Sequence, residues 1–305
     1  MTQALMIIPV AIGAGAMQAT NVTEEDHPEW DAAAVYQTGE RVILAARHQI
    51  YESLADENSG IAPEGADLSA QYWVAAGSTN RWRAFDATLG LVTSWPEAIT
   101  YRIGLPARVD AVAFIGLVAV SLQLVIRDSG GSVVYDRTAN LLDTGAIQSW
   151  LDFFTYEDSF DPEQIFADLG ALSGFTLEIT IANPGGTASV SEIVMGRGEL
   201  LGEVLEGSKS GFTDYSRREV DDFGNISIVK RATARKAEWQ LSFEATANRR
   251  IQRALEQARG APAYFYPGDD MTPFALAVYG VADDFFPALS GGGHTIATLS
   301  LTGVA

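Results

Sequence analysis

The chain has 305 residues, of which 47% are hydrophobic, and its 39 acidic and 20 basic residues give a net charge of −19. A chain of this length and hydrophobic content can bury real cores in two or three domains, which excludes a disordered protein. The lack of cysteine excludes disulfides, cysteine zinc sites and thiol nucleophiles. The acidic balance argues against nucleic-acid binding, because that function needs a basic surface.

The first apolar segment, residues 4–16, predicts a buried strand that belongs to a later sheet. No lysine or arginine precedes Arg41, so the segment lacks the basic start of a signal peptide. Pro9 and several glycines break it, and it is too short to span a bilayer. We therefore expect no membrane insertion for residues 1–28, whose polar end, residues 21–28, indicates a linker.

Residues 29–78 are dense in aromatic residues, glycine and acids, without helical spacing, which is typical of a small β-module. Its best candidates for carbohydrate contact are Trp30, Tyr36, Tyr51 and Trp73, because aromatic rings stack on the faces of sugars. A module of about 50 residues also needs such rings for its own core. We expect Trp30 and Tyr36 in that core, and Tyr51 and Trp73 at the surface.

The order of these aromatics, with Gly39, Val42 and Pro63 between them, resembles a chitin-binding-type carbohydrate-binding module. The segment that follows, Thr79-Asn-Arg-Trp-Arg-Ala-Phe-Asp86, resembles a junction in tail proteins of tailed bacteriophages. Together these resemblances imply a virion component with a module that contacts host-surface glycans.

Residues 79–200 contain several short apolar stretches separated by turn signals, which favours a β-sandwich. Residues 175–181 alternate with Phe175, Leu177, Ile179 and Ile181 facing inward. Turns are expected at residues 128–131 and 183–186. The layout resembles jelly-roll sandwiches of the galactose-binding type.

Residues 201–305 predict an α+β domain, in which a β-sheet carries one packed helix over residues 247–259. Thr246 is placed to cap the start of this helix, and Gly260 with Pro262 ends it. A glycine-flanked stretch, residues 207–211, indicates a hinge before this domain.

Three motifs near the end of the chain resemble the C-terminal domain of phage tail and baseplate proteins. They are Tyr215-Ser-Arg-Arg-Glu219, Asp222-Phe-Gly-Asn225 and Leu301-Thr-Gly303. The resemblance implies a structural protein of the virion tail tip that contacts other tail or baseplate proteins. Because tail assemblies are symmetric, it also implies a homo-oligomeric ring with three- or six-fold symmetry.

Basic residues gather in one part of this acidic chain. Residues 209–259 hold 11 of the 20 lysines and arginines and 7 of the 39 acids, a balance of +4, which leaves −23 for the remainder. This distribution suits an interface between unlike patches of neighbouring subunits. The arginines expected there are Arg217, Arg218, Arg231 and Arg235. Solvated arginines on a twisted strand pair are the alternative.

The sequence carries no signature of catalysis or of a bound cofactor. His27, His48 and His294 lie far apart, without the spacing of metal ligands, and no phosphate-binding loop or nucleophile elbow is evident. We therefore expect a non-enzymatic protein without metal or cofactor. The alternative is a polysaccharide-degrading enzyme or its carbohydrate-binding accessory protein, which would need two buried carboxylates that converge.

Overall fold

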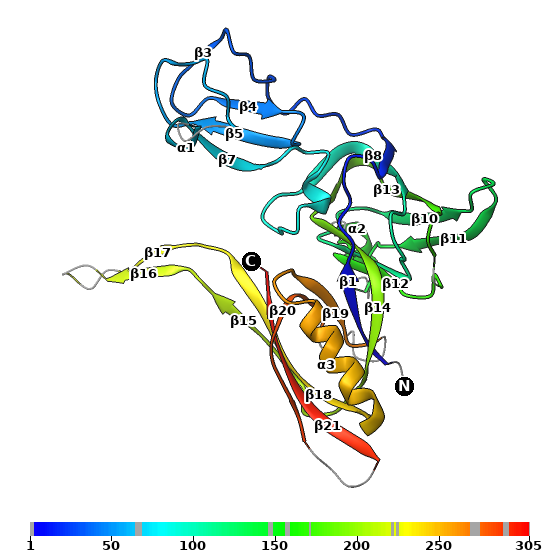
Figure 1. Ribbon diagram of the computed structural model, residues 1–305. Helices are drawn as coiled ribbons and strands as arrows, with labels where there is room; N and C mark the ends of the chain where they lie inside the picture. The colour runs from blue at the N-terminus through cyan, green and yellow to red at the C-terminus, as the bar shows by residue number, and fades with distance from the viewer. Residues whose placement is uncertain are drawn as a thin grey trace.

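The computed structural model describes residues 3–64, 69–145, 149–155, 159–170, 172–220, 223, 226–268, 275–288 and 293–304. It confirms the predicted mainly β fold. Figure 1 shows a small module, a sandwich, a C-terminal unit around one helix, and a long hairpin that leaves the body. Within the described ranges, no helix has the length and apolar character needed to cross a membrane.

The small module consists of two narrow sheets. β3 (Val35–Tyr36) pairs with β6 (Asn58–Ser59), and β4 (Arg41–Leu44), β5 (Gln49–Ser53) and β7 (Trp73–Ser78) form a three-stranded sheet. A single-turn helix, α1 (Ser69–Tyr72), leads directly into β7. The module buries Val42, Tyr51 and Trp73, with Trp30 and Tyr36 packed against them.

The phage-like segment 79–86 forms the joint between the module and the sandwich. Trp82 and Ala84 are buried in the sandwich core, and η1 (Arg83–Phe85) carries Phe85 against the same core. The segment predicted as a linker is fixed to this joint. Glu24 accepts one hydrogen bond from the Thr79 hydroxyl at 2.8 Å and pairs with His48 at 2.8 Å. Buried apolar and polar contacts therefore hold the module against the body.

The sandwich has two layers, a five-stranded sheet and part of the nine-stranded sheet that packs against it. The smaller sheet has the order β11-β10-β13-β8-β2, with β2 (Met17–Thr20), β8 (Thr93–Gly104), β10 (Ser121–Arg127), β11 (Val133–Asn140) and β13 (Thr176–Val190). Facing it are β9 (Ala111–Ile115), β12 (Glu163–Phe166) and β14 (Glu192–Val204). Apolar side chains of both layers form one core, with Leu177, Ile179 and Ile181 almost fully buried as predicted.

Of the two turns expected in the sandwich, the structure contains one. The turn at residues 128–131 is confirmed, because Asp128 accepts backbone hydrogen bonds from Gly130 and Ser132, both at 2.9 Å, between β10 and β11. The turn at residues 183–186 is wrong. Those residues form a bulge within β13, where its pairing with β8 shifts register between Ala182 and Thr187.

The C-terminal unit is a closed ring of strands. β14 pairs with β1 (Ala4–Pro9), and the order continues through β19 (Ala263–Tyr266), β20 (Val278–Pro287), β21 (His294–Gly303) and β18 (Thr233–Glu244). A short pairing of Glu203 and Val204 with Ser242 and Leu241 brings β18 back to β14. β1 is thus the buried strand of a later sheet that the sequence predicted, although it ends at Pro9.

Gly202 permits this closure. It has φ +113°, and a Cβ atom at this position would lie 2.5 Å from the backbone oxygen of Ser242 on β18. A side chain here would therefore separate the two strands that close the ring. β14 also crosses the expected domain boundary at residue 200, so the sandwich and the C-terminal unit share one strand.

The predicted helix packs on the ring. It consists of η2 (Ala245–Ala247) and α3 (Asn248–Gln257), and it buries Ile251, Ala254 and Leu255 in the C-terminal core. The predicted cap is wrong, because the cap position is Ala247 and no side chain caps it. Thr246 instead donates to Glu244 at 3.4 Å.

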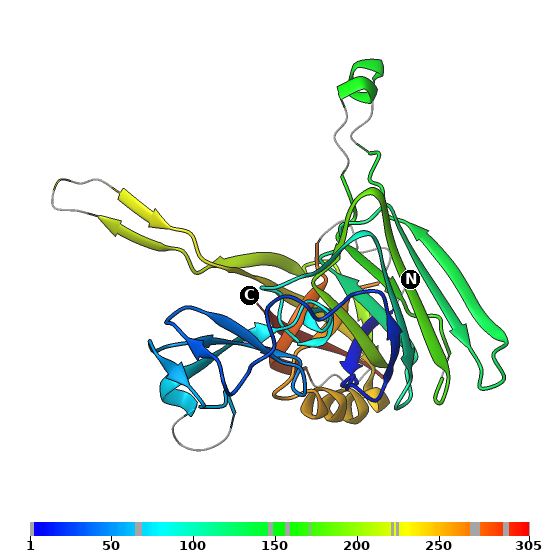
Figure 2. The same ribbon diagram turned by 90° about the horizontal axis from the view of Figure 1, so that it is seen from above.

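A two-stranded arm leaves the C-terminal unit (Figure 2). β15 (Lys209–Asp214) pairs with β18, and beyond it β16 (Arg217–Val220) pairs only with β17 (Ile226–Val229) among the described strands. The segment expected as a hinge, residues 207–211, instead holds the end of a tight turn at residues 205–208 and the first three residues of β15, which pair with β18. Of the Asp222–Asn225 motif, Asp222, Gly224 and Asn225 lie outside the described residues. We refer to β16 and β17 as the arm hairpin.

Candidate functional site

The two module aromatics expected at the surface are inside. Tyr51 is 6% exposed and Trp73 is 4% exposed, so the prediction that they are presented to solvent is wrong. Trp73 donates its indole N–H to the carbonyl of Ile61 at 2.8 Å and packs edge-on against Tyr36, with ring centroids 5.3 Å apart. A module this small has few other side chains large enough to form a core, so its biggest ring is buried at the centre.

Tyr51 is fixed by hydrogen bonds as well as by packing. Its hydroxyl lies 3.0 Å from the side-chain oxygens of both Gln49 and Glu64, and it donates its single proton to one of them at a time. Burial, together with the Glu64 carboxylate, raises the pKa of Tyr51 to about 12. The ring therefore stays neutral and anchored in the module.

Trp30 and Tyr36 are half-buried at the edge of the same core. The Tyr36 hydroxyl accepts the backbone N–H of Asp31 at 2.7 Å, which fixes the ring over the turn that follows Trp30. These two rings keep partial exposure, so they are the part of the aromatic set that remains available for a sugar. Trp30 and Tyr36 therefore pack against the core as predicted, but they are more exposed than Tyr51 and Trp73, the two rings that were expected at the surface.

The interface arginines divide between the arm and its root. Arg217, Arg218 and Arg231 lie exposed on or beside the arm hairpin, with Arg217 paired to Glu219 at 2.6 Å. Arg235 lies at the root of the arm on β18 and bonds the carboxylate of Glu163 from β12. The same chain thus supplies a carboxylate for Arg235, whose side chain remains 53% exposed, so its place at an interface stays a prediction.

The arm exposes a concentration of apolar side chains that the sequence analysis did not single out. Exposure is 75% for Phe212, 67% for Ile226, 58% for Ile228 and 50% for Val229. Ile228 lies directly opposite Arg218 across the hairpin, so both project from the same face. Among the residues that the structure describes, no layer covers β17, whose four side chains are all exposed.

A second apolar projection extends from the sandwich. α2 (Trp150–Thr155) stands away from the two sheets in Figure 2, with Trp150 80% exposed and Phe154 78% exposed. Five aromatic residues between positions 150 and 160 were the available signal in the sequence. Large exposed apolar side chains at two projecting sites are typical of contact surfaces.

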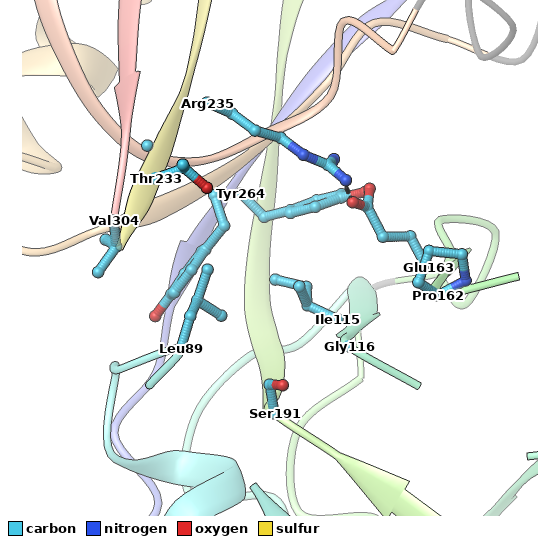
Figure 3. A pocket seen from close by; sticks show the side chains of 12 residues that line it. Leu89, Ile115, Gly116, Pro162, Glu163, Ser191, Thr233, Arg235, Tyr264 and Val304 are labelled. Atoms are coloured by element: carbon cyan, nitrogen blue, oxygen red, sulfur yellow. Dashed lines mark hydrogen bonds and ion pairs between the residues drawn. The ribbon is translucent and has the colours of Figure 1, made fainter. Parts of the chain in front are cut away.

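The root of the arm encloses a small pocket of about 230 Å³ (Figure 3). Glu163 binds Arg235 and accepts the Tyr264 hydroxyl at 3.1 Å. Tyr264 is paired in register with Tyr279 on β20. Burial, reinforced by the Glu163 charge, raises the pKa of Tyr264 well above its usual value. Glu163 thus joins β12, β18 and β19 through one charged cluster, and Tyr279 of β20 lines the same pocket.

Glu163 and Glu192 flank this region of the large sheet. Glu163 on β12 and Glu192 on β14 both pair with Ile115 of β9, the strand that lies between β12 and β14. Residues paired in this way project from the same face of the sheet. Glu192 is 4% exposed. Burial raises its pKa to about 9, and the nearby negative charge of Asp86 adds to this effect. Its carboxyl accepts the backbone N–H of Ala87 at 3.1 Å. Each acid therefore has a bonding partner within the chain.

The described residues hold no group of three or more histidine, aspartate or glutamate side chains arranged to bind a metal ion. Comparison with protein families, with curated proteins and with solved structures finds no match for this chain.

Proposed function

We propose that this chain is a structural subunit of a symmetric assembly, of the phage tail-tip or baseplate kind, and that its arm binds a neighbouring copy. The observation that carries the proposal is the arm hairpin, whose β17 side chains are all exposed. The motifs at residues 79–86, 215–219 and 301–303 support the tail-tip assignment by resemblance. The proposed place of action is the virion tail tip, among other tail or baseplate proteins.

An isolated two-stranded hairpin is at best marginally stable in water. The arm hairpin has that geometry, because among the described strands β16 pairs only with β17. Covering Ile226 and Ile228 on a neighbour would contribute about 2 kcal/mol for each side chain. Arg217, Arg218 and Arg231 add positive charge to the same segment, which suits the acidic remainder of a second copy.

Sedimentation velocity over a range of concentrations tests the arm. The double variant Ile226→Ser/Ile228→Ser is expected to weaken self-association at least tenfold, because it removes apolar area from the contact, while the unfolding midpoint stays unchanged. Ser227→Ala is the matched control, because Ser227 lies on the opposite face of β17. A wild-type chain that remains monomeric, or equal association by both variants, would contradict the proposal.

The module gives this assembly a second proposed role, contact with a host-surface glycan. What supports it is the half-exposed pair Trp30 and Tyr36, which lies in the order found in chitin-binding-type modules. On a glycan array, Trp30→Ala in the full chain is expected to lower binding by roughly 1–3 kcal/mol, as for other stacking platforms. If wild type binds no glycan, or if Trp30→Ala loses binding only because the variant unfolds, the glycan role is not supported and the module is a structural spacer.

The enzyme alternative rests on Glu163 and Glu192, two acids on one sheet face with different surroundings. We place them in a structural role because internal partners bond both of them and Glu192 does not line the pocket. Turnover of chitin, peptidoglycan or bacterial polysaccharide that disappears in Glu163→Gln or Glu192→Gln would favour a polysaccharide-degrading enzyme instead.

A further inference from the structure

A groove between α3 and β14 gathers four arginines in this acidic chain. Arg249, Arg250 and Arg253 reach it from the helix, and Arg197 reaches it from the strand. The cavity has a volume of about 420 Å³. Glu199 on β14 is the one acid in its lining, so the groove carries four guanidinium groups and one carboxylate.

Two of these arginines are held in place. The Glu199 side chain is only 9% exposed, and its two oxygens bind Arg197 and Arg250, the second at 3.0 Å. Arg250 also donates to the carbonyl of Leu200 at 2.7 Å. A buried carboxylate and a backbone carbonyl thus fix guanidinium groups at the wall of the groove before any partner arrives, which lowers the entropy cost of binding.

The other two arginines add charge that the described residues do not balance. Arg249 and Arg253 are four residues apart on α3, so they lie on the same side of the helix, where like charges destabilise it slightly. Neither side chain makes a hydrogen bond or ion pair with any residue in the described ranges. An anion bound between them would offset this repulsion.

We propose that the groove binds carboxylates of an acidic segment on a second copy of this chain. The planar fork of arginine can bind a carboxylate with two parallel hydrogen bonds, and the groove already holds one carboxylate at its wall, because Glu199 contacts Arg197 through one oxygen and Arg250 through the other. A second copy supplies the ligand, because its residues outside 209–259 have a balance of −23. The inference rests on the proposed assembly and adds a contact distinct from the arm.

A variant of the free arginines tests the groove. In sedimentation velocity at low salt, Arg249→Ala/Arg253→Ala is expected to weaken self-association at least tenfold, while raising the salt to 0.5 M is expected to abolish the difference from wild type. Arg259→Ala is the matched control, because Arg259 lies just beyond α3, outside the groove. Alanine favours helix, so circular dichroism should show an intact fold.

The readouts separate the groove from the arm. Salt at 0.5 M screens arginine–carboxylate contacts at both sites, whereas the apolar part of the arm contact, through Ile226 and Ile228, persists. If the arm variants weaken self-association but Arg249→Ala/Arg253→Ala does not change it, the groove proposal is wrong and the arm proposal stands. A direct probe is fluorescein-labelled octaglutamate at 0.15 M salt, followed by anisotropy. Wild type is expected to bind it at least tenfold more tightly than the double variant, and equal or absent binding overturns the inference whatever the arm does.

Discussion

Glu192 makes the stability of this protein depend on pH near neutrality. Its carboxyl is almost fully buried at the start of β14, and burial, assisted by the Asp86 charge, raises its pKa from 4.5 to about 9. The folded state therefore favours the protonated acid. The contribution of Glu192 to stability is complete below about pH 4.5, where it is protonated in both states, and is lost progressively as the pH rises toward 9.

The size of this loss follows from the shift. One pKa unit corresponds to about 1.4 kcal/mol, so at pH 7 the wild-type chain loses about 3 kcal/mol relative to a chain with a neutral residue there, and at pH 8 about 5 kcal/mol. Glu192→Gln supplies that neutral residue and keeps an oxygen for the Ala87 N–H. We expect the variant to gain stability over wild type steadily between pH 5 and 8.

Urea unfolding followed by circular dichroism at pH 5, 6, 7 and 8 measures the difference directly, and other titrating groups cancel between the two chains. Asp86→Asn is an informative companion, because it removes the nearby charge while Glu192 remains. It should lower the folded-state pKa of Glu192, so that the loss of stability levels off at a lower pH without disappearing. If the difference in unfolding free energy between wild type and Glu192→Gln stays constant within about 1 kcal/mol from pH 5 to pH 8, Glu192 does not titrate as we infer.

Three further outcomes follow from the fold and the surface. Trp73→Ala should destabilise the module by about 3–5 kcal/mol, seen as early loss of near-ultraviolet dichroism, since the ring is its central core residue. Gly202→Ala should lower the free energy of unfolding by about 2 kcal/mol or more, because a Cβ atom meets the Ser242 oxygen at a position with positive φ; an unchanged urea midpoint would show that the ring closes differently. Trp150→Ser/Phe154→Ser should leave the urea midpoint unchanged while reducing binding of an apolar dye, because both rings are exposed.

The sequence by itself determined the local elements. Alternation identified the strand at residues 175–181, and the sequence placed one helix over residues 247–259, where η2 and α3 lie. Asp128 with its glycines identified the β10–β11 turn. Each of these signals depends on residues close together in the chain, where backbone preferences and side-chain period act directly. The basic segment was also visible from the sequence, because charge requires only a count.

Only the tertiary structure decided which surfaces are covered. Tyr51 and Trp73 are aromatic residues of the kind that stack on sugars, yet they are buried, because the module has few other large apolar side chains to form a core. The ring of strands closes through Gly202 and Ser242, whose contact joins positions 40 residues apart. Arg235 is taken by Glu163 and Arg250 by Glu199, while Arg249 and Arg253 are left facing a groove. Burial and pairing depend on residues distant in the chain, so local pattern cannot assign them.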